Sequence, residues 1–243
     1  MKRWLLAALL LASCIEASQT RLQVALVATG SASSGVQVDD TAIVLSRAEV
    51  AFGPAYFCAT QSADPELCAV ALLELRDTVR IDALVAQSQD LGTLDGTSGE
   101  VRSALYDYGI SWPRTRTAAA PAAAAPQGHS ALLAGEAERA GQRLRFRAAI
   151  DVIPRARGDA AMNAQRTRHT LSAEGDVLRV RVDPLRWFKY VQPDALFALD
   201  VDGDGEVVLA PGDQAYEALL QGLQSAAPLS FEWERADPDD AGE

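Results

Sequence analysis

Residues 200–213, DVDGDGEVVLAPGD, carry the side chains whose spacing is best suited to chemistry in this chain of 243 residues. Carboxylates stand at every second position, on Asp200, Asp202 and Asp204, and Gly205 follows them. Hard oxygen ligands at alternate residues can curl around Ca²⁺, and the glycine permits the sharp turn that this requires. The spacing therefore indicates a calcium-binding loop.

The segment resembles the calcium loops of EF-hand and dockerin-type proteins, with its aspartates at positions 1, 3 and 5. The resemblance implies that Glu206 binds calcium through its backbone carbonyl and that short helices flank the loop. Position 12, which should supply a bidentate carboxylate, is Pro211, and the next carboxylate, Asp213, comes two residues late. We therefore expect a structural calcium site with weak affinity, of about 10⁻⁴–10⁻³ M. The alternative is an acidic turn without metal.

The amino-terminal residues have the pattern of an export signal. Two basic residues precede an unbroken apolar run, residues 4–12, which has the length of a signal-peptide core and half that of a membrane span. The run leads into Leu-Ala-Ser-Cys, ending at Cys14, which resembles the lipobox of bacterial lipoproteins. The resemblance implies cleavage before Cys14 and acylation of its sulfur and new amino group. Ile15, where aspartate would retain the protein in the inner membrane, favours the outer membrane.

The remaining cysteines, Cys58 and Cys68, form an even pair in a chain expected to be exported. They bracket a short segment that contains Asp64-Pro65, a turn signal. An oxidising compartment favours a disulfide between them, and a pair of copper ligands is the alternative.

Charge and composition bound the organisation of the chain. Removal of the signal peptide would leave 20 basic and 33 acidic residues, a net charge of −13, which argues against nucleic acid as a partner. We expect a signal peptide over residues 1–13 and a lipidated tether over 14–21. One folded domain should follow over 22–235, with an Ala/Pro-rich exposed loop at 117–128, and then an acidic disordered tail over 236–243.

Strand patterns dominate the expected domain. In residues 142–154 and 176–184 apolar and charged residues alternate strictly, which is typical of strands with one buried face. Residues 129–146 read as a hairpin that turns near Ala140-Gly141, and Val44, Ala48, Val50 and Phe52 are expected on one buried face. Short helices are predicted over 193–199 and after Asp213, which is a natural N-cap. The fold class is therefore mainly β, an antiparallel, immunoglobulin-like β-sandwich with one or two short C-terminal helices.

The strand-rich segments VQVDDTAIVLSRAEVAFGPAYFC, GHSALLAGEAERAGQRLRFRAAIDV and LRVRVDPLRWF resemble secreted β-sandwich lipoproteins of proteobacteria, including myxobacteria. They are distantly similar to the periplasmic copper-binding partner proteins of methanobactin systems. In that copper group histidine and tryptophan act at the metal, but no motif here carries those roles over to His129 or Trp187.

No catalytic constellation is evident in the sequence. It has two histidines, no G-x-S-x-G elbow, no glycine-rich phosphate loop and no His-x-x-x-His pair. We therefore expect a lipid-anchored outer-membrane protein that is not an enzyme and binds a protein or another envelope component. A periplasmic copper-handling protein is the second hypothesis, and a glycan-acting envelope enzyme is the third.

Overall fold

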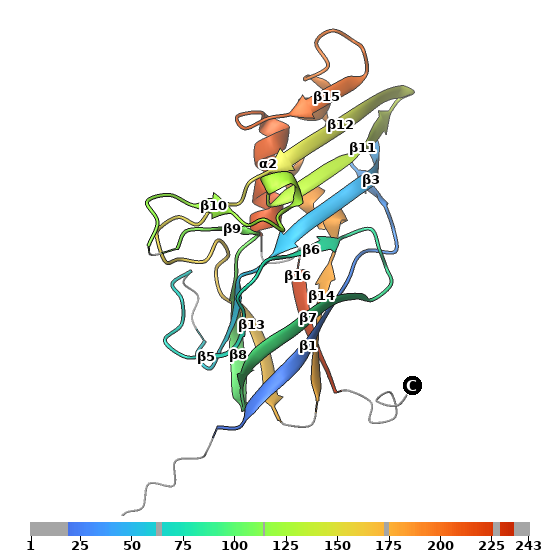
Figure 1. Ribbon diagram of the computed structural model, residues 1–243. Helices are drawn as coiled ribbons and strands as arrows, with labels where there is room; N and C mark the ends of the chain where they lie inside the picture. Colours follow the sequence, from blue (N-terminus) through green and yellow to red (C-terminus); the bar gives the residue numbers. More distant parts are fainter. Residues whose placement is uncertain (1–18, 62–64, 114, 173–174, 226–228, 236–243) are drawn as a thin grey trace, which may run out of the picture.

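The computed structural model describes residues 19–61, 65–113, 115–172, 175–225 and 229–235. The chain is mainly β, with two large sheets that lie one above the other in Figure 1. The described ends of the chain, where β1 begins and β16 finishes, lie at the same end of the molecule, beneath the larger sheet (Figure 1).

The larger sheet has the strand order β13-β8-β4-β5-β7-β1-β14-β16. Its strands are β1 (Arg21–Thr29), β4 (Ala55–Cys58), β5 (Ala71–Leu75), β7 (Gln89–Thr97), β8 (Gly99–Tyr106), β13 (Gln165–Leu171), β14 (Asp176–Val182) and β16 (Leu229–Arg235).

The smaller sheet has the order β15-β12-β11-β3-β2, and β6 also pairs with β3. Its strands are β2 (Gly35–Val38), β3 (Thr41–Phe52), β6 (Val79–Asp82), β11 (Ala131–Arg139), β12 (Gln142–Ile150) and β15 (Glu206–Leu209). The other elements are β9 (Ile110–Ser111), β10 (Ala120–Pro121), the 3₁₀ helices η1 (Pro126–Gly128) and η2 (Pro184–Tyr190), α1 (Pro193–Phe197) and α2 (Gln214–Gln224).

The strands with strict alternation form as predicted. Leu144, Phe146 and Ile150 of β12 are buried, and the arginines between them are exposed. The β11–β12 hairpin turns at Ala140 and Gly141, whose φ angles are 49° and 83°. Two consecutive positive φ angles match the twist of the flanking strands in a two-residue hairpin loop.

The prediction of purely antiparallel sheets is wrong. β1 lies between β7 and β14 and runs parallel to β14, and β12 runs parallel to β15. Parallel neighbours require long crossover connections, and the segment between β12 and β15 supplies one that contains η2 and α1. The sheets are therefore mixed, and an immunoglobulin-like sandwich stays a prediction.

The larger sheet curls so that its two edge strands, β13 and β16, approach each other through side chains. The indole Nε1 of Trp233 on β16 donates to Oγ1 of Thr167 on β13 at 2.8 Å. The same indole stacks on the ring of His169 at a centroid distance of 4.7 Å. Phe231 of β16 packs inside the curl against Phe57 at 5.5 Å. We refer to this contact between β13 and β16 as the seam.

Helix α2 packs on η2 much as its sequence pattern predicts. Leu219 and Leu223 are fully buried, and Gly222 allows close approach because a Cβ there would lie 2.1 Å from the carbonyl oxygen of Trp187. Asp213 stands at the N-cap position, but its carboxylate accepts from the amide of Ala210 at 2.7 Å, so the predicted side-chain cap on the helix is absent.

Part of the Ala/Pro-rich segment is buried, which corrects the prediction of an exposed loop over residues 117–128. Residues 120–121 form β10, and Ala125 is only 4% exposed. Pro126 begins η1 and is also buried. Proline suits the first position of such a helix, because the amide there has no hydrogen-bond acceptor within the helix and its absence costs nothing.

Candidate functional site

A β-bulge on β3 turns the side chain of Val44 to the exposed face of the sheet, although the sequence pattern predicted it in the core. Val44 is 52% exposed, so its predicted position on the buried face is wrong. Arg47 of β3 pairs with Ala134 of β11, whereas the next residue of β11 pairs with Leu45, which leaves Ser46 unpaired. A single extra residue inverts the alternation, and bulges commonly redirect side chains in this way.

The bulge contributes to a groove of about 400 Å³ on the exposed face of the smaller sheet. Its lining consists of Val44 and Ser46 from β3, residues 134–136 from β11, residues 145–147 from β12, and Glu206 from β15. Gly135 allows the strands to approach closely there, because a Cβ would lie 2.4 Å from the carbonyl oxygen of Val44. We call this feature the bulge groove.

The bulge groove combines an apolar wall with polar groups of which two are unpaired. Arg145 pairs with Glu206 at 3.5 Å. Arg147 has no carboxylate partner, and the Ser46 hydroxyl has no hydrogen-bond partner, among the residues that the structure describes. A guanidinium and a hydroxyl beside Val44 can bind a ligand that carries an anionic group on an apolar body.

Two carboxylates flank the bulge groove and lie on strands that are not neighbours. Glu136 and Glu206 both pair in register with Arg145, so their strands are two apart, about 10 Å at the backbone. Both side chains are about half exposed, and each lies within ion-pair distance of an arginine.

The predicted calcium ligands come together only in part. Asp200, Asp202 and Asp204 have carboxylate oxygens within 4.8 Å of one another, whereas the Asp213 carboxylate lies outside this group; a ligand role for the Glu206 carbonyl stays a prediction. Asp213 instead bonds the backbone next to α2, as described above. The loop follows α1 but leads into β15, not directly into a helix, which departs from the EF-hand arrangement. Calcium binding by the three aspartates stays a prediction.

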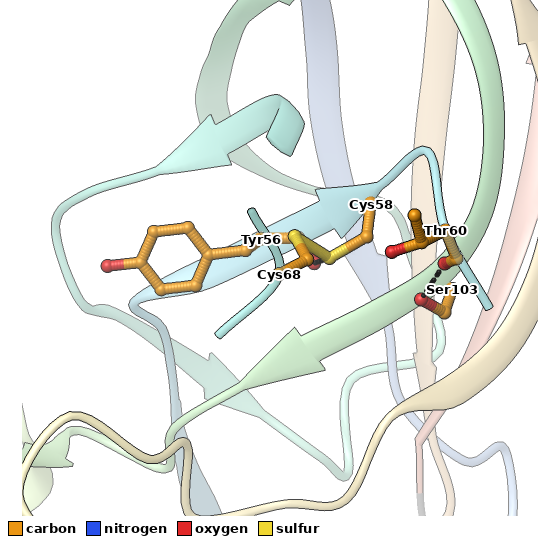
Figure 2. The surroundings of a disulfide bond; sticks show 5 residues. All are labelled: Tyr56, Cys58, Thr60, Cys68 and Ser103. Atoms are coloured by element: carbon orange, nitrogen blue, oxygen red, sulfur yellow. Dashed lines mark hydrogen bonds between the residues drawn. A yellow bond between two sulfur atoms is a disulfide. The ribbon is translucent and has the colours of Figure 1, made fainter. Parts of the chain in front are cut away.

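The predicted disulfide is present. Cys58, the last residue of β4, is joined to Cys68, and Figure 2 shows its surroundings. The bond closes a loop across ten positions of the sequence. Beyond Cys58, the carbonyl of Thr60 accepts a hydrogen bond from the hydroxyl of Ser103 on β8 at 2.7 Å (Figure 2). Together the disulfide and this bond fix the segment that leaves β4.

A buried carboxyl lies close to this region, and the sequence analysis did not identify it. Asp107, directly after β8, is 6% exposed, and its Oδ1 accepts from the amide of Ala161 at 2.6 Å. Burial raises the pKa of Asp107 to about 7, although the bond from Ala161 acts in the opposite direction. Burial and the charge of Asp107 also raise the pKa of the Tyr56 hydroxyl. Nothing in the sequence around Asp107 distinguishes it from an exposed acidic residue.

The two histidines lie in different parts of the fold and contact different carboxylates. His129 precedes β11, and its Nδ1 is 2.9 Å from Asp151. His169 lies on β13, with its Nε2 3.0 Å from Oδ1 of the buried Asp176, but without the alignment of a hydrogen bond. Among the described residues, neither histidine belongs to a group of three possible metal ligands. Copper binding stays a prediction that these contacts do not favour.

The serine beside the first histidine is not placed as a nucleophile. Ser130 is fully buried, and its hydroxyl oxygen accepts from the amide of Val152 at 3.0 Å. It lies in the bend just before β11 of the smaller sheet, whereas His169 lies on β13 of the larger one. The described part of the chain therefore does not bring these two residues together as a catalytic pair.

Comparisons with known proteins identify no relative of this chain. No protein-family model, curated protein or solved structure matches the chain. The predicted lipidation site, Cys14, lies outside the described residues. Within the described part, no helix has the length and apolar character needed to cross a membrane.

Proposed function

We propose that this protein is an outer-membrane lipoprotein, anchored through Cys14, whose folded part is a non-enzymatic binding module. The bulge groove is its ligand site. The observation that carries this assignment is that Arg147, Ser46 and the exposed Val44 line one groove, where Arg147 has no carboxylate partner and the Ser46 hydroxyl no hydrogen-bond partner among the described residues. These groups suit an extended ligand with a carboxylate or phosphate, from a protein or another envelope component.

The position of the first strand supports the anchored arrangement. β1 begins at Arg21, seven positions after Cys14, and seven residues span at most about 25 Å. A lipid on Cys14 would therefore hold the beginning of β1 next to the bilayer. The smaller sheet lies at the opposite end of the molecule (Figure 1), so the bulge groove would face away from the membrane, whether into the periplasm or at the cell surface.

The anchor and the groove are tested separately. Mass spectrometry of the native protein should find acylated Cys14 as the first residue; an unmodified cysteine or a retained leader would contradict the anchoring.

For the groove, a photo-crosslinking amino acid at Val44 should capture a defined envelope ligand in intact cells. The same substitution at Val70, which is 49% exposed against 52% for Val44, is the matched control. Arg147→Ala should reduce the Val44 crosslink at least threefold, because it removes the unpaired guanidinium. Equal crosslinking at both positions, or an unchanged yield with Arg147→Ala, would contradict the groove as the ligand site.

A further inference from the structure

Three arginines gather on the outer side of the larger sheet, far from the bulge groove in the fold. Arg102 lies on β8, and Arg166 and Arg168 lie on the neighbouring edge strand β13. With Thr167 and Gln61 they line a depression of about 330 Å³. We call this depression the arginine pocket.

The arginine pocket carries excess positive charge. Its lining holds three guanidinium groups and no carboxylate. Glu100, at its margin, is shared by Arg102 at 2.7 Å and Arg168 at 3.5 Å, and the hydrogen bond from Arg102 lowers the pKa of Glu100. Among the residues that the structure describes, one carboxylate thus faces three cations, in a chain whose net charge is −11. The arginine pocket is therefore a positively charged site on a chain that is acidic overall.

Arg166 pairs with an amide and not with an acid. The side-chain oxygen of Gln61 accepts from Nε and Nη2 of Arg166 at 2.5 and 3.1 Å. No carboxylate partner of Arg166 occurs in the part of the chain that the structure describes. A neutral amide satisfies the donors of the guanidinium without cancelling its charge, so this arginine stays available to an anion.

The groups of the arginine pocket are held by contacts on both sides. Gln61 is the third residue after Cys58, whose disulfide fixes the segment, and the bond to Ser103 ties its neighbour to β8 (Figure 2). Thr167 is 9% exposed and is held across the seam by the indole of Trp233. The pocket is therefore built by the disulfide and the seam together.

We propose that the arginine pocket binds a phosphate group. The planar fork of a guanidinium matches two phosphate oxygens, and three such forks beside the Gln61 amide supply more donors than a lone surface arginine. The pocket lies along the middle of β8, since Arg166 pairs with Ser103, five residues beyond Ser98, whose amide donates to the carbonyl of Thr20 where the chain enters the sheet. A lipid headgroup and a soluble phosphate ester can both supply this chemistry. The proposal does not depend on lipidation of Cys14.

Calorimetric titration of the purified full chain with inorganic phosphate, in a non-ionic detergent at constant ionic strength, tests the proposal. Arg166→Ala should weaken phosphate binding at least fivefold, and Arg166→Lys, which keeps the charge but loses the fork, by an intermediate factor. The matched control is Arg143→Ala, which removes an exposed arginine of the smaller sheet and should change binding less than twofold. Unchanged melting temperatures would show that the variants remain folded.

Lipid added to the micelles identifies the source of the phosphate. Competition by phosphatidylglycerol, but not by diacylglycerol, assigns the pocket to a membrane headgroup; no competition by either lipid assigns it to a soluble phosphate ester. The proposal is overturned if the wild-type chain binds no phosphate, if Arg166→Ala binds as well as wild type, or if Arg143→Ala loses as much. None of these results bears on the bulge groove, so the two assignments fail independently.

Discussion

Asp107 shows how one buried carboxyl couples stability to pH. The unfolded chain should release its proton near pH 4, whereas the folded protein releases it near pH 7 because burial disfavours the charge. Between these values, unfolding releases a proton, so rising pH favours the unfolded state. The stabilisation is complete below about pH 4 and is lost as the pH rises to about 7, a change of about 4 kcal/mol for this group.

Asp107→Asn should remove this pH dependence while keeping an oxygen that accepts from Ala161. The variant should be more stable than wild type at pH 8, with little difference at pH 4.5, as measured by urea unfolding at both values. Asp77→Asn, at an exposed carboxylate, is the control and should show no such divergence. A stability difference for Asp107→Asn that stays constant across this range would contradict the role assigned to burial.

Residue types alone predicted the candidate sites unevenly. The cysteine pair was predicted because export and an even number of cysteines suffice to indicate a disulfide. Val44 was misplaced because a bulge at Ser46 leaves no mark in an alternating pattern. The arginines of the arginine pocket looked like solvated residues of separate strands, since Arg102 and Arg166 meet only through pairing across more than sixty positions.

At the scale of elements, strict alternation was a reliable guide and weak alternation was not. β12 and β14 were predicted because each has one charged and one apolar face. β7 was not identified, because it contains Gly92 and Gly96 and few apolar residues; Gly96 passes so close to β5 that a Cβ would lie 2.0 Å from the carbonyl oxygen of Leu72. β13 was missed because arginines and threonines dominate it, and its place is set by antiparallel pairing with β8, far from it in the sequence.

The disulfide loop offers a prediction at this scale. Replacing Cys58 and Cys68 by alanine should lower the free energy of unfolding by about 2–4 kcal/mol, because the unfolded chain regains the entropy of the open loop. It should also weaken phosphate binding, since Gln61 loses its support. Denaturant unfolding with and without reductant measures the effect: reductant should destabilise the wild type and leave the double variant unchanged. An equal unfolding midpoint for both proteins would contradict this role.

At the scale of the whole molecule, the seam determines whether the larger sheet keeps its curl. Contacts between side chains, not backbone pairing, join the two described edge strands. Loss of these contacts should therefore destabilise both β13 and β16. Trp233→Ala should lower the free energy of unfolding by about 2–4 kcal/mol, since an aromatic ring is removed from partly buried surroundings.

Trp233→Phe is the matched variant for the seam. It keeps an aromatic ring against His169 but loses the bond to Thr167, so it should cost about 1 kcal/mol. Hydrogen exchange of the β13 and β16 amides should increase in Trp233→Ala more than in Trp233→Phe. Equal protection in both variants would show that the backbone of the sheet holds its shape without this contact.

The placement of β1 between two partners has a mechanical consequence. If the chain is tethered through Cys14, any pull from the membrane enters along β1 and is resisted by the hydrogen bonds to β7 and β14 together. Force along the length of a strand must shear many such bonds at once, whereas force across an edge strand would peel them one by one. A tether at Cys14 would thus load an interior strand of the larger sheet and not one of its edges.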